Sequence, residues 1–297
     1  MLETILFIDG SKTSILLLNR IIKAKKFNIK FIILSPSCDK IIGKKLLKKY
    51  NKKIQISDLK NKKIIKKLLL FSCDMGFSYY DKKISIDIIN SFKIGGINFH
   101  PSFLPYNKGR HSAFWAINQS TPFGATSHWL NEKFDDGDIF IQKKIKFDNF
   151  ENAKTIYDKQ FKLLAEIIIK TIKHISNNKF FRKKNNNKIN DYHFAGDIKK
   201  LTNLNYNKEI SNIRLGNLIR STCYNDNTGF NIILDSKVYF IVSKYSVKRG
   251  KYKKKYITSI NKIYKNISLR NKFSFMIFVK NFQIKVVSRV AKIFNVT

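Results

Sequence analysis

The sequence predicts an α/β fold with a mostly parallel sheet, followed by a small β-rich C-terminal domain. Three observations support this prediction. Short apolar runs alternate with amphipathic segments in the first hundred residues, one long amphipathic segment follows, and the pattern then changes to strand-like alternation. Strands that alternate with helical segments indicate βαβ units and a parallel sheet. The length of 297 residues is consistent with about two domains.

The elements of the first half follow one another in a regular order. Apolar runs predict strands at 4–9, 28–35, 53–56, 73–77 and 95–99. Helical spacing predicts helices over 14–24, 39–50 and 59–69, and later a long helix over 152–175. Two further strands are expected at 123–130 and 139–142. In parallel sheets ligands bind beyond the carboxyl ends of the strands, so chemistry is expected just after residue 99.

The second half predicts a different architecture. We expect one α/β domain over 1–177, an Asn- and Lys-rich linker at 178–190, a small β-rich domain at 191–245 and a basic C-terminal extension at 246–297. Residues 231–244 alternate like two strands around a tight turn at Asp235-Ser236. Two more strand-like runs, 274–280 and 282–288, lie in the extension without clear turn signals.

The chain is strongly basic, with 58 Lys or Arg, 20 Asp or Glu and a formal net charge of +38. Such a charge is a first sign of nucleic-acid binding. However, the excess is almost all Lys, and the chain is also rich in Ile and Asn, a composition that an A/T-rich genome produces without functional demand. The exception is Ser236 to Thr297, which holds 16 Lys or Arg and no acidic residue, and where an anionic partner could bind.

Several function classes are disfavoured by composition. No apolar stretch of about 18 residues occurs, so no transmembrane helix or membrane partner is expected. The three cysteines, at positions 38, 73 and 223, are odd in number and far apart, which argues against a disulfide framework and a CxxC metal site. The N-terminus reads as a first strand and not as a signal peptide, and a cytoplasmic location is the expectation.

Residues able to do chemistry gather between Gly96 and Gln142. Asn98 and His100 alternate at the end of a predicted strand, so their side chains point to the same side. Asp135 begins an acidic turn before the next strand, and a polar pair facing such a turn suits acid–base chemistry. Each residue alone could be structural, Asn98 as a turn residue, His100 as a loop histidine and the acids as a solvated turn.

Three motifs in this stretch resemble, in order and spacing, the signature of the folate-dependent formyltransferases. They are Asn98-Phe99-His100-Pro101-Ser102 with Leu104-Pro105 and Gly109, then Gly124-Ala125-Thr126-Ser127-His128, then Phe134-Asp135-Asp136-Gly137-Asp138. The resemblance implies a Rossmann-like catalytic domain over 1–177. It also implies that a primary amine attacks the formyl carbon of 10-formyltetrahydrofolate, with no metal.

The resemblance also implies roles for individual residues. The catalytic residues would be Asn98, as an N–H donor to the oxyanion, His100, as donor or proton shuttle, and Asp135, whose carboxylate would raise the pKa of His100 and fix its ring. The residues implied for folate binding are Phe77, Ser78, Tyr79, Leu130 and Asp136. Those implied for substrate binding are Ser102, Tyr106, Gly109, Trp115 and His128.

The formyl acceptor is predicted to be an amino-sugar nucleotide. The stretches 104–117 and 120–130 are most similar to the sugar-nucleotide N-formyltransferases. The segment Gly10-Ser11-Lys12-Thr13-Ser14 departs from the G-x-G-S-N phosphate loop of glycinamide ribonucleotide formyltransferase. Methionyl-tRNA formyltransferase is the main alternative, because 215–234 resembles the start of its C-terminal domain and the basic C-terminal region could contact tRNA. A non-catalytic folate-, nucleotide- or RNA-binding protein is a further alternative, and a homodimer is possible.

Overall fold

The structure is a computed structural model, and it divides into two compact units. It describes residues 1–50, 55–57, 59, 62–71, 73–147, 151–185, 189, 191–204, 217–218, 220–222, 230–234, 237–243, 275–279 and 283–286. The first unit comprises residues 1–109, 123–145 and 159–192. The second comprises 110–122, 146–158 and 193–297.

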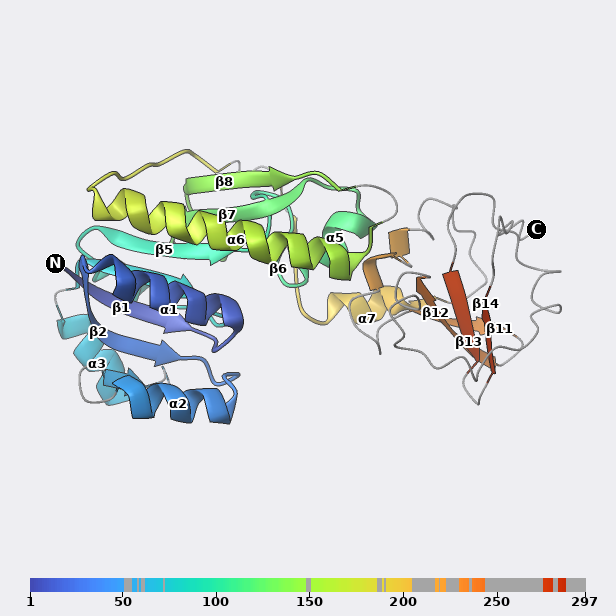
Figure 1. Ribbon diagram of the computed structural model, residues 1–297, viewed down its shortest axis with the longest axis horizontal. Helices are drawn as coiled ribbons and strands as arrows, with labels where there is room; N and C mark the ends of the chain where they lie inside the picture. The colour runs from blue at the N-terminus through green and yellow to red at the C-terminus, as the bar shows by residue number, and fades with distance from the viewer. Residues whose placement is uncertain are drawn as a thin grey trace. The chain divides into compact units, whose positions relative to one another are not determined.

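A seven-stranded sheet in the order β3-β2-β1-β4-β5-β7-β8 forms the centre of the first unit (Figure 1). The first five of these strands run parallel, and β7 and β8 are antiparallel. The strands are β1 (Leu2–Ile8), β2 (Phe27–Leu34), β3 (Gln55–Ser57), β4 (Met75–Tyr79), β5 (Gly95–His100), β7 (Phe123–Trp129) and β8 (Ile139–Ile145). The predicted α/β fold with a mostly parallel sheet is confirmed.

Helices cover both faces of this sheet, because successive strand residues point to opposite sides. Leu6 and Ile8 of β1 belong to the core cluster that includes residues of α1 and α6. Ile5 and Phe7 belong to the cluster that includes residues of α3 and α4. The helices are α1 (Lys12–Ala24), α2 (Lys40–Tyr50), α3 (Lys62–Leu70), α4 (Ile86–Asn90) and α6 (Ala153–Ser176). The sequence did not predict α4, which is too short to show helical periodicity.

The second unit holds α5 (Ser112–Asn118), α7 (Asp197–Thr202) and a five-stranded sheet in the order β10-β11-β12-β13-β14. Its strands are β10 (Asn203–Leu204), β11 (Phe230–Leu234), β12 (Lys237–Ser243), β13 (Phe275–Val279) and β14 (Gln283–Val286). The antiparallel pairing of β11 with β12 confirms the two strands predicted over 231–244, whereas the turn at Asp235-Ser236 lies outside the described residues. The strands β13 and β14 lie within the runs 274–280 and 282–288.

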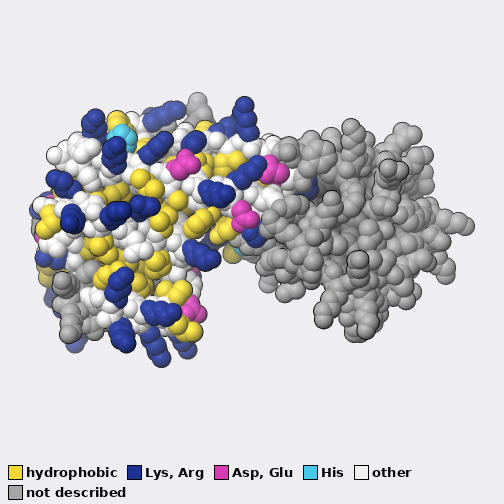
Figure 2. Space-filling view, in the orientation of Figure 1, with side chains coloured by type: hydrophobic (Ala, Val, Ile, Leu, Met, Phe, Trp, Pro, Cys, Tyr) yellow, Lys and Arg dark blue, Asp and Glu magenta, His cyan; other side chains and the backbone are white. Residues whose placement is uncertain are grey.

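Basic side chains are spread widely over the first unit. On the face drawn in Figure 2, the Lys and Arg side chains are scattered and separated by apolar ones. This distribution agrees with a compositional origin for much of the charge. Most of Ser236–Thr297 lies outside the described residues. No helix in the described parts of the chain combines the length and the apolarity needed to cross a membrane.

Candidate active site

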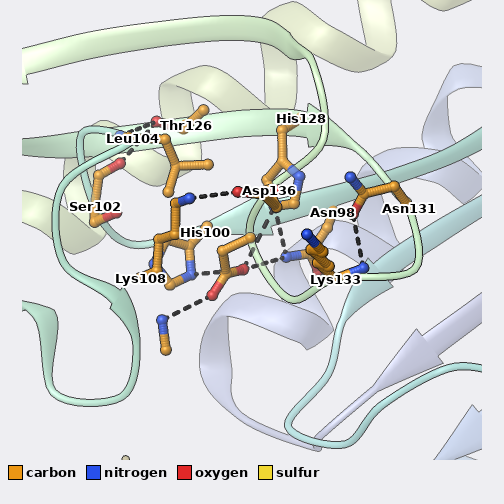
Figure 3. A network of polar contacts seen from close by, with 12 residues as sticks. Asn98, His100, Ser102, Leu104, Lys108, Thr126, His128, Asn131, Lys133 and Asp136 are labelled. Atoms are coloured by element: carbon orange, nitrogen blue, oxygen red, sulfur yellow. Dashed lines mark hydrogen bonds and ion pairs between the residues drawn. The ribbon is translucent and has the colours of Figure 1, made fainter. Parts of the chain in front are cut away.

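The predicted catalytic residues come together at the carboxyl end of β5. Asn98 and His100 lie two residues apart on this strand, and their side chains point to the same side, as the alternation predicts. His128 lies opposite Asn98 on the neighbouring strand β7. Asp135 lies in the 130–138 loop, which joins β7 to β8. Figure 3 shows the side chains of Asn98, His100 and His128 gathered at this end of the sheet.

The Asp135 carboxylate lies at the centre of the polar network and contacts four groups. Its Oδ1 lies 3.3 Å from Nδ1 of His100, 3.5 Å from Nε2 of His128 and 3.5 Å from Nδ2 of Asn98. Its Oδ2 accepts a hydrogen bond of 2.9 Å from the backbone N–H of Gly109. Asp135 is only 7% exposed, so these partners take the place of water around the carboxylate.

Two residues of the site have left-handed backbone conformations. Asp135 has a φ of 53° and Asn107 a φ of 55°. Asp and Asn adopt this region more readily than other non-glycine residues. The carbonyl of Asn107 lies 3.2 Å from Nε2 of His100, so the two ring nitrogens of His100 face Asn107 and Asp135. The 101–109 loop therefore holds one edge of the His100 ring, and the 130–138 loop holds the other.

Asp135 raises the pKa of His100, as expected, but the net pKa of His100 is lowered. Burial of the ring has the largest effect and lowers the pKa, while Asp135 and the Asn107 carbonyl act in the opposite direction. For Asp135, burial alone would raise the pKa, but His100, His128 and the Gly109 N–H together lower it to about 2. The structure therefore favours a neutral imidazole beside an ionised carboxylate near pH 7.

His128 is fixed by bonds at both ring nitrogens. Its Nδ1 lies 2.9 Å from the carbonyl of Trp129, and its Nε2 lies 3.1 Å from Nδ2 of Asn98. Because a carbonyl can only accept, Nδ1 carries a hydrogen and Nε2 faces the Asn98 amide. Asn98 itself is half-buried.

Sequence reasoning missed Lys108, which forms a buried ion pair with Asp136. Their side chains are 7% and 12% exposed. This pair and the Gly109–Asp135 hydrogen bond both join the 101–109 loop to the 130–138 loop. In a chain with so many lysines, nothing in the sequence distinguishes Lys108 from the others.

Thr126 fixes the start of the 101–109 loop. Its Oγ1 donates to the carbonyl of Ser102 over 2.7 Å and accepts the N–H of Leu104 over 3.2 Å. The side chain of Gln142 donates to the carbonyl of Leu104 over 3.0 Å. The Oγ of Ser102, one of the predicted substrate-binding groups, is buried and has no hydrogen-bond partner within the described residues.

The other predicted binding residues fall at three places. Phe77 and Ser78 are buried in β4, Tyr79 ends that strand half-buried, and Leu130 begins the 130–138 loop. Tyr106 is half-buried on the 101–109 loop, whose Gly109 contacts Asp135. Trp115 belongs to the second unit, where its ring stacks on His193 with centroids 3.8 Å apart and an angle of 7°.

The described residues contain no cluster of three or more His, Cys, Asp or Glu side chains suited to a metal ion. The side chains that meet at the site are an amide, two imidazoles and a carboxylate. Together they can donate hydrogen bonds to a developing negative charge and accept a proton from a nucleophile.

Comparison with known proteins agrees with this chemistry. The family model described as formyl transferase matches residues 42–172, which include Asn98, His100 and Asp135. A bifunctional polymyxin resistance protein ArnA from Wigglesworthia glossinidia brevipalpis is 31% identical over 191 residues, 64% of this chain and 29% of that protein. A methionyl-tRNA formyltransferase from Ehrlichia ruminantium (strain Gardel) is 32% identical over 99 residues, 33% of each chain. The chain therefore spans about a third or less of the length of these two relatives.

Solved structures of formyltransferases have a similar fold. A 4-N formyltransferase from Francisella tularensis has a TM-score of 0.65 and 25% identity, with 79% of this chain and 93% of that one covered. An N-formyltransferase from Helicobacter canadensis, in complex with folinic acid and dTDP-3-aminofucose, has a TM-score of 0.57 and 18% identity over 99% of this chain and 100% of that one. The resemblance to the formyltransferases is thus confirmed, and residues 42–172 match the formyl transferase family.

Proposed function

We propose that this chain transfers the formyl group of 10-formyltetrahydrofolate to the primary amine of an amino-sugar nucleotide. The observation that carries the proposal is the contact of one buried carboxylate, Asp135, with both His100 and Asn98 at the carboxyl end of β5. In the proposal Asn98 is the oxyanion donor and His100 the proton acceptor, and both lie within the residues that match the formyl transferase family.

In the proposed reaction, the amine nitrogen forms a bond to the formyl carbon, and the carbonyl electron pair moves onto oxygen. The Asn98 amide, whose bond to Asp135 is long at 3.5 Å, donates an N–H to that oxyanion. His100, which is neutral because burial lowers its pKa, accepts the proton that the amine loses. The Asp135 carboxylate stabilises the imidazolium that forms. The carbon–nitrogen bond to folate N10 then breaks, and N10 takes a proton from His100.

For the folate we propose the region between the end of β4 and the 130–138 loop. Tyr79, Leu130 and Asp136 have partly exposed side chains there, while Phe77 and Ser78 lie buried in β4. Leu130 is brought close to β5 because Gly96 has no side chain, and a Cβ on Gly96 would lie 2.5 Å from Leu130 Cδ1. For the acceptor we propose Ser102, Tyr106, Gly109 and His128, all in the first unit.

An amino-sugar nucleotide is favoured as the acceptor by the sequence of the stretches 104–117 and 120–130 and by the structural relatives. One of these relatives is described as a 4-N formyltransferase, and another was solved with dTDP-3-aminofucose. Methionyl-tRNA is the second candidate. It is favoured by the methionyl-tRNA formyltransferases among the sequence relatives, and by the acid-free, basic segment Ser236–Thr297.

The test is to incubate the full chain with 10-formyltetrahydrofolate and one amine at a time. The panel comprises 3-amino- and 4-amino-dideoxy sugar nucleotides, methionyl-tRNA and glycinamide ribonucleotide. Tetrahydrofolate release and the mass of the product report transfer. We expect a product with at least one amino-sugar nucleotide. Formylation of methionyl-tRNA alone would refute the acceptor, and no product with any amine would refute formyl transfer.

A further inference from the structure

Residues 181–185 and 191–192, which the structure describes, contact the two loops that form the site and the strands beside them. The indole N–H of Trp129 donates to the carbonyl of Phe181 over 2.8 Å, and the Arg182 guanidinium lies 3.9 Å from the centre of a Trp129 ring. Lys183 exchanges two backbone hydrogen bonds with Ile139, of 2.7 and 2.9 Å. Residues 181–183, which lie in the stretch 178–190 predicted as a linker, therefore contact the strands on both sides of the 130–138 loop.

We infer that Asn185 and Asp191 are positioning residues. They keep the His100 ring and the Asp135 carboxylate in contact with each other. The inference deepens the proposed function and rests on it. The hydrogen bonds of Asp191 go to the backbone of Asn107 and Lys108, and that of Asn185 goes to the backbone of Asp135. Each acts through the backbone of the loop that carries or contacts a predicted catalytic side chain.

Asp191 holds the 101–109 loop. Its Oδ2 accepts the backbone N–H of Asn107 over 2.6 Å, and its carbonyl accepts the N–H of Lys108 over 2.8 Å. The Asn107 carbonyl in turn lies 3.2 Å from Nε2 of His100. Asp191 thus fixes the peptide groups on both sides of the residue whose carbonyl orients the His100 ring.

Asn185 holds the 130–138 loop. It is 2% exposed, and its Nδ2 donates to the backbone carbonyl of Asp135 over 3.4 Å. The rotation of the Asp135 backbone decides whether its carboxylate reaches His100, His128 and the Gly109 N–H. A bond at the carbonyl limits that rotation.

The two backbones held in this way are both left-handed. Asn107 and Asp135 have φ values of 55° and 53°. Such conformations persist at functional sites when the surrounding structure over-determines them. Here Asp191 bonds to Asn107 and Asn185 bonds to Asp135, 84 and 50 positions away in sequence. The position of His100 relative to Asp135 therefore depends on the hydrogen bonds that Asp191 and Asn185 make.

The test compares Asp191→Ala and Asp191→Asn with a control, Lys184→Ala, whose side chain is exposed within residues 181–185. The first readout is the protonation midpoint of His100, followed by NMR of the ring nitrogens and assigned with His100→Gln. The groups that face His100 are Asp135, His128 and the Asn107 carbonyl. The Asn107 carbonyl raises the pKa of His100, so releasing it in Asp191→Ala is expected to move the midpoint to lower pH. Asp191→Asn keeps an acceptor and should restore the wild-type midpoint.

The second readout is steady-state kinetics with the best amine from the panel. We expect kcat of Asp191→Ala to fall roughly 10- to 100-fold while both KM values stay within about twofold, and Asn185→Ala to behave alike. An unshifted midpoint with unchanged kcat overturns the inference, as does a lower yield of folded protein without a midpoint shift. In the wild-type chain, rapid exchange of the Asn107 amide hydrogen would also overturn it, even if Asp191→Ala does not fold. If no amine is formylated, the proposed function fails, but the midpoint and exchange readouts still decide the positioning role.

Discussion

Nδ1 of His100 lies 3.3 Å from Oδ1 of Asp135, and both side chains are less than a tenth exposed. An ionised carboxylate in this position can stabilise the imidazolium that forms when His100 takes a proton from an amine. Burying either the His100 ring or the Asp135 carboxylate alone would be unfavourable. In this contact each group is the polar partner that water would otherwise be for the other. The chemistry and the stability of the site therefore depend on one pair.

Asp135→Asn is expected to lower kcat/KM for formyl transfer roughly 10²- to 10⁴-fold, because the amide has similar size but no charge to stabilise an imidazolium. Steady-state kinetics with the accepted amine measure the effect, and circular dichroism checks the fold. Glu166→Gln is the matched control, since Glu166 is exposed and pairs only at the surface with Lys143. Equal rates in the two variants would show that Asp135 plays no part in proton transfer.

Asn98→Ala is expected to lower kcat roughly 10²- to 10³-fold, the usual effect of removing one oxyanion donor. Single-turnover measurements with saturating folate separate this step from product release. Asn19→Ala, at an exposed position of α1, serves as the control. A rise in KM with unchanged kcat would instead assign Asn98 to ground-state binding.

The stability of the first unit is expected to fall in acid in two steps. Burial lowers the pKa of His100, so the unfolded chain binds a proton that the folded chain does not, and stability is lost as the pH falls below about 6.5. The pKa of Asp135 is lowered to about 2, so its contribution of about 2 kcal/mol is present above about pH 4 and is lost as the pH falls toward 2.

Urea unfolding followed by tryptophan fluorescence between pH 7 and pH 2 measures both steps. His100→Gln should flatten the profile in the upper range, and Asp135→Asn should flatten it in the lower range. A profile that keeps the wild-type shape in both variants would place the acid sensitivity elsewhere in the chain.

The sequence predicted those parts of the site that depend on strand alternation or on motif order. Asn98 and His100 share a side because they are two residues apart on a strand, and a strand has a period of two. Asp135 followed from the resemblance, and its contact with both residues is what the structure adds. The order of strands and helices was likewise predictable, because buried parallel strands read as short apolar runs.

The remaining features depend on contacts that carry no local signal. The Asn107 carbonyl can hold His100 whatever the side chain at position 107, and Asp191 meets Asn107 across 84 positions of sequence. The direction of the His100 pKa depends on burial outweighing a neighbouring carboxylate, and such a balance cannot be read from residue types.

Lys108→Met is expected to destabilise the first unit by about 3 kcal/mol, because it leaves the Asp136 carboxylate buried without its partner. Adding Asp136→Asn should recover much of this loss, since the buried charge is then removed. Lys143→Met breaks only the exposed pair with Glu166 and should cost less than about 1 kcal/mol. Urea midpoints of the four proteins test the comparison, and equal losses for Lys108→Met and Lys143→Met would contradict it.

Gly137→Ala is expected to disturb the site through the backbone alone. A Cβ at position 137 would lie 1.9 Å from the carbonyl oxygen of Trp129 and 2.8 Å from its carbonyl carbon, so the 130–138 loop must move away from β7. That movement should cost about 2 kcal/mol or more and should pull Asp135 away from His100. Gly196→Ala is the control, because nothing lies within 4 Å of a Cβ at that position. The His100 midpoint and kcat should change together in Gly137→Ala and stay at wild-type values in Gly196→Ala. Loss of stability with both quantities unchanged would mean that the loop yields without moving Asp135.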